Sequence, residues 1–560
     1  MTTPLHRLAD ELNTRLLRAD PFGASEFGLQ EYDALVPDAS PEGEAELRAD
    51  LGRIRDRVAE LAGPGTDLSA DEATLAAAID AFAGGALLDL DIAAVEYTVT
   101  PHPWSGPATL VAIASRTKLA DGDAAEAYLS RLRGSAGWID AVTGRLRAGA
   151  ANGLTPVSTL TANALTWVDA VLADPAPRAL ISPEPPAGWD GADGWRERLV
   201  AVATDTVRPA LERWRDAVRD ELLPVARDDD RAGLVWLPGG EQRYADAIRR
   251  HTTLPLAAQE IHEIGLEAVG RLEARAVELG AQLDLPDLDA VHAAFRAGTL
   301  TDAQEALGLV RAAVRRAEAV ADRVVAPPLP PPCAVEPMPE PVASSGTAPH
   351  YTLPRTDGTR PGTYWFNTLL PTMGTGWDLE AVAFHEAVPG HHLQLARAQA
   401  NTALPALLTQ SLVTVHAEGW GLYTERLSGE LGLYSDVRQE IGAVFAELHR
   451  AARLVVDTGI HALGWSREQA RGYLLDHMPA PEPFLTSETD RYIAWPGQAL
   501  AYMTGQREIL RLRDVARDAL GAGFDLPGFH GAVLDHGSLP LPALGVVVRR
   551  WVDEQRPAAG

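Results

Sequence analysis

A run of prolines in the middle of the chain limits its fold more than any other feature. Residues 327–332 read Pro-Pro-Leu-Pro-Pro-Pro, and Pro337, Pro339 and Pro341 follow. Proline lacks the amide hydrogen that a helix needs, and its ring crowds the preceding turn, so this stretch cannot be helical. Because helical patterns lie on both sides, we interpret it as an extended crossing between a helical N-terminal lobe, residues 1–325, and a second lobe, residues 326–560.

The segments around this crossing predict a mainly α protein with a small β element. Apolar residues recur at three- and four-residue steps over residues 125–148 and 256–281, which is typical of amphipathic helices. Residues 350–353 and 363–368 are rich in aromatic residues and threonine, and turn residues such as Asp357 and Gly358 separate them. We expect these two segments to form a strand pair, with helical patterning resuming from Leu379 to the C-terminus.

Composition excludes several classes of function. Among 560 residues, 77 Asp and Glu face 49 Lys and Arg, which gives a net charge of −28. A surface this acidic repels nucleic acid phosphates and anionic membranes, so we expect neither as a partner. Cys333 is the single cysteine, which rules out a disulfide within the chain.

No segment of the sequence has the character of a membrane anchor. Residues 1–20 mix basic and acidic side chains and contain no apolar core of signal-peptide length. The longest stretch without Asp, Glu, Lys or Arg, residues 398–417, carries too many polar side chains to be a membrane span. The sequence therefore predicts a cytoplasmic enzyme and leaves its oligomeric state open.

The segment from His385 to His392 reads His-Glu-Ala-Val-Pro-Gly-His-His and resembles an interrupted zinc-protease helix. The usual motif, H-E-x-x-H, places two metal-binding imidazoles one turn apart with a glutamate base between them. A four-residue step rises about 6 Å and stays on one helical face, whereas the six-residue step to His391 rises about 9 Å and reaches another face. A straight helix therefore cannot bring both histidines to one ion.

Pro389 and Gly390 offer a way around this limit. Pro389 cannot donate to the carbonyl of His385, and Gly390 relaxes the backbone. A bulge that absorbs two residues would place His391 where the second histidine normally lies. His392 would require three absorbed residues, so we prefer His391 and keep His392 as the alternative.

The expected third metal ligand is a carboxylate on a later helix. Glu418 falls near the apolar face formed by Leu412, Val415 and Leu422. A carboxylate that faces inward needs a cation or a hydrogen-bond partner. Glu425, two turns further on, is a competing ligand or a residue that supports the ligands.

Glu386 selects among the chemistries that two histidines and a carboxylate allow. The same ligands could hold iron for an oxygenase, but an oxygenase needs no general base beside the first ligand. A hydrolase does need one, because a metal-activated water must lose a proton. We therefore expect a zinc hydrolase with Glu386 as the base, which makes the second lobe the catalytic one. A metal-dependent oxidoreductase and a non-catalytic helical binding protein are the alternatives.

Five further residues are candidates for the reaction. Tyr492, Tyr502 and His461 could each donate a hydrogen bond to an oxyanion, although each could equally be a packing residue. Arg491 could bind a substrate carboxylate or pair with an acidic neighbour. Asn367, after the second predicted strand, could bond to an extended substrate or belong to a turn.

These motifs together resemble one large bacterial family. They are His-Glu-x-x-Pro-Gly-His-His, Glu418-Gly419-Trp420, the segment 453–461, and Arg491-Tyr492 followed by Pro-Gly-Gln-Ala. The family is catalogued as domain of unknown function 885 and is regarded as a group of candidate zinc metallopeptidases of the gluzincin type. The resemblance extends over nearly the whole chain and implies a metallopeptidase without naming a substrate.

The arrangement is more distantly similar to angiotensin-converting enzyme, thimet oligopeptidase and carboxypeptidase Taq. This similarity implies a two-lobed helical fold with a deep central cleft, which would admit short peptides or small amides. In angiotensin-converting enzyme an Arg-Tyr pair supplies the oxyanion donor, and Tyr492 holds the matching position. Dipeptidyl peptidase three also has a lengthened His-Glu motif that binds zinc, and the motif here is longer by one residue.

Overall fold

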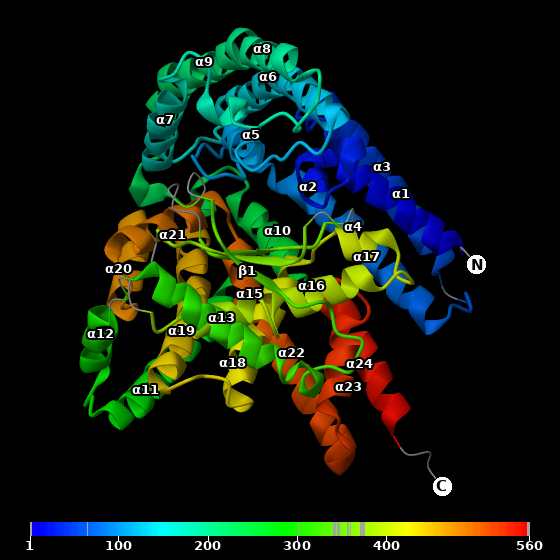
Figure 1. The fold of residues 1–560 in the computed structure, drawn as a ribbon, viewed down its shortest axis with the longest axis vertical. Helices are drawn as coiled ribbons and strands as arrows, with labels where there is room; N and C mark the ends of the chain where they lie inside the picture. Colours follow the sequence, from blue (N-terminus) through cyan, green and yellow to red (C-terminus); the bar gives the residue numbers. More distant parts are fainter. Residues whose placement is uncertain are drawn as a thin grey trace.

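The structure is a computed structural model that describes residues 3–556 apart from 64, 299, 301, 340–342, 344–347, 356–357, 359 and 370–375. Pro341 of the crossing and Asp357 of the expected turn lie outside the described residues. The fold is mainly α-helical with a small three-stranded sheet, which confirms the predicted fold class at this level (Figure 1).

The helices before the crossing include the two that the sequence periodicity predicts. Their bounds are α1 (Pro4–Ala19), α2 (Pro21–Glu26), α3 (Pro41–Leu61), α4 (Ala70–Ile92), α5 (Pro107–Ala114), α6 (Gly122–Ala151), α7 (Ser158–Leu172), α8 (Ala192–Val202), α9 (Arg208–Ala217), α10 (Gly240–Thr252), α11 (Ala258–Gly280), α12 (Leu288–Ala297) and α13 (Ala303–Glu318). Helix α6 covers the predicted segment 125–148, and α11 covers nearly all of 256–281.

The helices after the crossing contain the candidate site. They are α15 (Leu379–Glu386), α16 (His391–Ala400), α17 (Ala406–Gln410), α18 (Thr414–Glu430), α19 (Val437–His461), α20 (Arg467–His477), α21 (Glu482–Ala494), α22 (Ala501–Leu520), α23 (Leu526–Leu534) and α24 (Leu541–Gln555).

The sheet contains the predicted strand pair and one strand more. β2 (His350–Thr352) runs antiparallel to β3 (Thr363–Phe366), as expected. The proline-rich crossing supplies β1 (Ala334–Pro337), which pairs in parallel with β3, so the strand order is β1-β3-β2. Tyr364 and Phe366 of β3 pack with Phe384 of α15, so the sheet lies against the helix that carries the His-Glu motif.

The hydrophobic core does not follow the sequence division at residue 325. One cluster joins α10 and α11 to α19, α20 and α21. A second joins α1, α3 and α4 to α18, α22, α23 and α24. A third lies within the first half, among α2 and α5 to α9, and forms the upper part of the molecule in Figure 1. The two lobes and the deep cleft between them stay predictions.

Helices α18 and α22 cross at a contact that only glycine allows. A Cβ added to Gly419 would lie 2.4 Å from Cα of Gly505, and one added to Gly505 would lie 2.0 Å from the carbonyl oxygen of Val415. Real side chains do not tolerate such distances, so the two backbones approach directly. This contact sets the position of α18 relative to the C-terminal helices.

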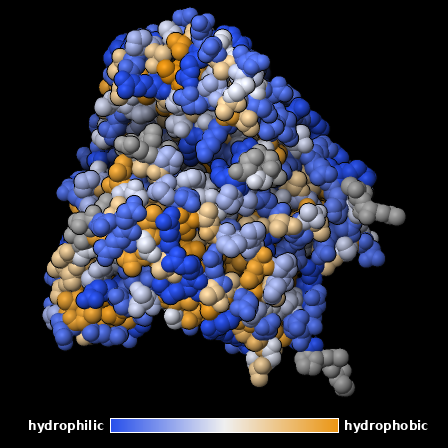
Figure 2. Space-filling model, viewed as in Figure 1, coloured by the Kyte–Doolittle hydropathy of each residue, from blue (hydrophilic) through white to orange (hydrophobic). Residues whose placement is uncertain are grey.

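The face of the molecule seen in Figure 2 is mainly hydrophilic. Smaller hydrophobic areas lie between the hydrophilic residues. Among the described residues, no helix is both long enough and apolar enough to cross a bilayer.

We predict that Gly505→Ala lowers the thermal unfolding midpoint, because the new methyl group collides with α18. Overpacking of this kind costs about 1–3 kcal/mol. The control is Gly270→Ala on the exposed face of α11, where an added Cβ meets nothing within 4 Å. That control should stabilise the helix by roughly 0.5–1 kcal/mol. Equal midpoints for the two variants would contradict the proposed crossing.

Candidate metal centre

The interrupted motif forms two helices rather than the expected bulge within one. Helix α15 ends at Glu386, Ala387 leaves helical geometry with φ −101° and ψ −110°, and α16 begins at His391. A Cβ at Gly390 would lie 1.9 Å from the carbonyl oxygen of His385, so the chain turns here only because residue 390 is glycine. The break achieves what the bulge was expected to do, because it re-aims His391.

Helix α18 stabilises this break. The indole N–H of Trp420 donates to the carbonyl oxygens of Pro389 at 2.9 Å and Gly390 at 3.3 Å. The hydroxyl of Thr424 donates to the carbonyl oxygen of Phe384 at 3.3 Å. Carbonyl groups that the interrupted helix leaves unpaired are therefore satisfied by the next helix.

His385, His391 and Glu418 meet at this point. Each offers one ligand atom, and the three atoms lie within 4.8 Å of one another. The Oε2 atom of Glu418 is 3.3 Å from Nε2 of His385 and 3.5 Å from Nε2 of His391. Two imidazoles and a carboxylate are a usual donor set for a catalytic zinc ion, so these residues fit a metal.

One face of α18 receives the ring of His385. Glu418, Gly421 and Glu425 follow at helical spacing on this face, and Glu425 accepts from Nδ1 of His385 at 2.8 Å. A Cβ at Gly421 would lie 2.6 Å from Cε1 and 2.7 Å from Nε2 of the imidazole. The missing side chain of Gly421 therefore makes room for the ring between the two carboxylates. Of the two roles considered for Glu425, this contact fits the supporting one, because it fixes which nitrogen of His385 points to the centre.

His392, the alternative ligand, lies outside this group. Its Nε2 donates to the carbonyl oxygen of Pro331 at 2.7 Å, and its Nδ1 is 3.1 Å from the hydroxyl of Tyr351. Burial lowers the pKa of His392, although the Pro331 carbonyl works against that effect. The ring is therefore neutral and binds the proline-rich crossing to β2.

The protonation of the centre follows from its charges. Burial would lower the pKa of His385, but Glu418 and Glu425 outweigh it and raise this pKa to about 9. Burial would raise the pKa of Glu418, but hydrogen bonds from His385 and His391 hold it well below its usual range. Without a metal, the imidazole of His385 is therefore protonated on both nitrogens at neutral pH and lies between the two carboxylates.

Glu386 is held by the sheet. Its Oε2 accepts from the backbone N–H of Tyr351 at 2.9 Å. This N–H is free to do so because β2 is at the edge of the sheet and, among the described residues, pairs with β3 alone. No sequence pattern pointed to Tyr351, because its part is played by the backbone.

Tyr492 lies in a buried network around Glu488. Its hydroxyl donates to Glu488 at 2.7 Å and accepts from Nε of Arg453 at 3.0 Å, and Nε2 of His449 lies at the same distance. Arg491 donates from Nε and Nη2 to Glu488 and from Nη1 to Gln498. The structure thus places Arg491 in an ion pair and gives the Tyr492 hydroxyl three partners.

Sequence reasoning missed His449 and Arg453 as parts of this network. These two residues lie one turn apart on α19 and face α21. Glu488 lies on α21 itself, one turn before Tyr492. The spacing of Glu488 and Tyr492 was visible in the sequence. The packing of α19 against α21 was not.

Tyr502 is the phenol next to the metal centre. Its ring stacks near the ring of His385, with centroids 6.4 Å apart, and it is partly exposed whereas Tyr492 is buried. Burial and the charge of Glu418 raise the pKa of Tyr502, so its hydroxyl keeps its proton at neutral pH.

His461 and Asn367 have structural partners. The backbone N–H of Leu234 donates to Nδ1 of His461 at 3.2 Å, and Nε2 donates to the carbonyl oxygen of Tyr492 at 3.0 Å. Both ring nitrogens are therefore occupied. The side chain of Asn367 donates to the carbonyl oxygen of Ala343, which precedes β2, and accepts from the N–H of Leu369 in its own loop.

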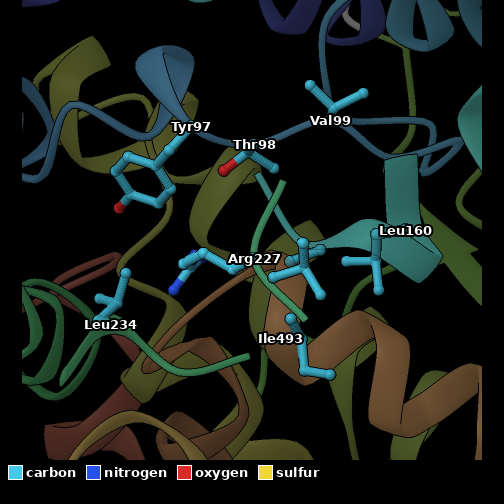
Figure 3. A pocket seen from close by; sticks show the side chains of 9 residues that line it. Tyr97, Thr98, Val99, Leu160, Arg227, Leu234 and Ile493 are labelled. Atoms are coloured by element: carbon cyan, nitrogen blue, oxygen red, sulfur yellow. The ribbon is translucent and has the colours of Figure 1, made fainter. Parts of the chain in front are cut away.

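A small pocket lies at the C-terminal end of α21 (Figure 3). It is lined by Tyr97, Thr98, Val99, Val157, Leu160, Arg227, Leu234, Ile493 and Ala494. Its volume of about 10 Å³ admits one particle the size of water. None of the predicted site residues lines it, and its volume is too small to hold a peptide.

We predict that zinc binding to the metal-free protein releases a proton from His385. The metal and the proton compete for the same imidazole. The apparent affinity should therefore rise about tenfold per pH unit below pH 9 and level off above it. Calorimetric titration in buffers of different ionisation enthalpy measures the released proton directly. An affinity that does not change between pH 7 and pH 9 would contradict the protonated His385.

Comparisons with known proteins agree with the fold. A candidate lipoprotein from Colwellia psychrerythraea shares 27% sequence identity, with a TM-score of 0.88 over 98% of this chain and 99% of that one. A candidate lipoprotein of unknown function from Shewanella oneidensis shares 18% identity, with a TM-score of 0.74 over 97% and 99% of the two chains. The second likeness concerns the fold alone.

No curated protein matches the chain significantly. A family model described as a bacterial protein of unknown function, DUF885, matches residues 21–548. Because that match spans nearly the whole sequence, the chain belongs to the DUF885 family.

Proposed function

We propose that this protein is a zinc-dependent hydrolase of peptide or small amide bonds. The observation that carries the proposal is the convergence of His385, His391 and Glu418, with Glu386 next to His385 in the sequence. Zinc bound by these residues would acidify a water molecule and polarise a carbonyl group. The remaining tasks fall to side chains of the chain itself.

Glu386 is the general base of the proposed reaction. It follows the first ligand in sequence, and the backbone of β2 fixes one of its oxygens. Holding one oxygen leaves the other to take a proton and pass it to the leaving amine. The hydrogen bond from the backbone of Tyr351 thus supports a defined orientation of the base.

Tyr502 is the proposed oxyanion donor. Resemblance to angiotensin-converting enzyme favoured Tyr492, but the hydroxyl of Tyr492 already donates its one proton to Glu488. Tyr502 lies beside His385 and holds its proton at neutral pH. A neutral phenol can stabilise developing negative charge by donating a hydrogen bond. In this proposal Tyr492 has a structural role behind the site, and His461 donates a hydrogen bond to its backbone carbonyl.

An oxidoreductase with iron on the same ligands is the alternative. The position of Glu386 favours hydrolysis, because an oxygenase has no use for a base beside its first ligand. Oxygen consumption by iron-loaded protein under a range of reductants would support the alternative.

The location of the protein is a separate proposal. Both structural neighbours are described as candidate lipoproteins, a description that fits the cell envelope better than the cytoplasm. We therefore propose an envelope location in place of the cytoplasmic one that the sequence predicts. Fractionation of cells that express the natural gene distinguishes the two.

We predict that Glu386→Gln keeps about one zinc per chain and loses hydrolysis. General base catalysis contributes about 10²–10⁴ in rate, so kcat should fall by that factor. Metal analysis and peptide cleavage are measured on the same preparation. Glu482→Gln on the surface of α21 is the matched control and should behave as wild type. Turnover by Glu386→Gln at the wild-type rate would refute this mechanism.

We predict that Tyr502→Phe lowers kcat about 100-fold, because loss of one oxyanion donor typically costs 10²–10³. Tyr492→Phe should instead lower the thermal unfolding midpoint, since it removes one donor to Glu488 and leaves Nε of Arg453 without its acceptor. Its kcat should fall less than that of Tyr502→Phe. The reverse order of the two kcat values would restore Tyr492 as the donor.

A further inference from the structure

Two guanidinium groups share one carboxylate behind the metal centre. Arg453 and Arg491 both form ion pairs with Glu488, at 3.0 Å and 2.9 Å. In the described part of the chain, neither arginine has another carboxylate within ion-pair distance. Arg453 and Arg491 are each less than one-tenth exposed, so this charge count concerns a desolvated cluster.

The other members of the cluster do not balance the charge. Burial and the neighbouring Arg453 hold the pKa of His449 well below its ordinary value, so the imidazole is neutral. Burial raises the pKa of the Tyr492 phenol, so it is neutral as well. Two cations and one anion therefore leave one net positive charge. An uncompensated charge out of water is costly unless a ligand or partner neutralises it.

The unused hydrogen-bonding capacity belongs to Arg453. All three nitrogens of Arg491 have acceptors, in Glu488 and Gln498. Arg453 donates from Nε to Tyr492 and from Nη2 to Glu488. Its Nη1 is buried and finds no acceptor among the described residues. The excess positive charge therefore lies beside a guanidinium nitrogen that is buried and unpaired.

Arg453 also has the right position relative to the metal centre. Its guanidinium lies over the ring of Tyr502 at 4.6 Å, and this ring stacks on His385 with a centroid distance of 6.4 Å. An extended peptide residue spans about 3.5 Å. A group held at Arg453 would therefore lie within about three residues of a bond at the centre.

We propose that Arg453 binds a carboxylate of the substrate, so that the enzyme acts on short peptides next to a free C-terminal carboxylate. This inference rests on the proposed hydrolase function and adds its substrate class. It also transfers the role expected for Arg491 to Arg453. A carboxylate matches the charge and the geometry of a guanidinium nitrogen with free N–H groups. An acidic side chain of the substrate has the same chemistry, and the experiment separates the two sources.

The first test compares three peptides of the same sequence length on the zinc-loaded, full-length protein. One has a free C-terminus, one is amidated, and one is amidated with glutamate as its last residue. We expect amidation to lower kcat/KM about 10- to 100-fold, the usual worth of a hydrogen bond to a charged group. If the glutamate restores cleavage, the carboxylate comes from a side chain. Equal cleavage of the free and amidated peptides by the wild type would overturn the proposal without any variant.

Variants then connect this preference to the residue. Arg453→Gln should cleave the free and amidated peptides equally, mainly through a rise in KM for the free acid. Arg453→Lys keeps the charge and should keep part of the preference. Arg511→Gln, on the exposed side of α22, is the matched control. A full preference for the free acid in Arg453→Gln would overturn the assignment.

A binding measurement keeps the proposal testable if the protein cleaves none of these peptides. Glutarate has two carboxylates and no scissile bond, and glutaramide is its neutral counterpart. Glutarate should raise the thermal unfolding midpoint of the zinc-loaded wild type and of Arg511→Gln, but not that of Arg453→Gln, and glutaramide should raise none. Equal shifts in wild type and Arg453→Gln would contradict the role of Arg453. Absence of cleavage with the expected glutarate shifts would contradict only the hydrolase function.

Discussion

The candidate centre depends on how two backbone carbonyls at the break between α15 and α16 are satisfied. A buried carbonyl without a donor costs about 1–3 kcal/mol, and a helix that stops in the protein interior leaves several. Here the indole of Trp420 supplies the donor from α18. Because Glu418 lies two residues earlier on the same helix, the interaction that stabilises the break also aligns the third ligand. Helix α18 therefore both satisfies the backbone carbonyls at the break and positions the third ligand.

The sequence predicts the outline of this centre but not its construction. Helical arithmetic excludes a straight helix, and Pro389 and Gly390 mark the only place where the spacing of His385 and His391 can change. That reasoning brings the two histidines and Glu418 together, as the structure does. It does not distinguish a bulge from a full break, because the choice depends on Trp420, a residue far along the chain. The sequence predicts the strand pair β2 and β3 of the small sheet. It does not predict β1, because this strand directly follows a run of prolines and has no strand pattern of its own.

The residues around the reaction were harder to assign, for a physical reason. A tyrosine, an arginine or a histidine has several uses, and its neighbours in space decide among them. Tyr492 is held by Arg453 and His449, which lie about 40 residues away in sequence. The two nitrogens of His461 contact Leu234 and Tyr492, and no local pattern reports either contact. His392 likewise binds the carbonyl of Pro331. The proline run therefore provides a partner for His392, and this histidine does not join the metal ligands.

The shared core has a consequence for how the chain is made. Leu5, Leu8 and Leu12 of α1 belong to the same hydrophobic cluster as Leu541 and Val548 of α24. Helix α1 packs against α3 and α4, which follow it directly, but their common cluster is complete only when α18 and α22 to α24 have been synthesised. Contacts between the ends of a long chain form slowly, and exposed apolar surface in the meantime favours aggregation. We therefore expect that this protein completes its folding only after release, with the cluster of α1, α3 and α4 partly uncovered during synthesis.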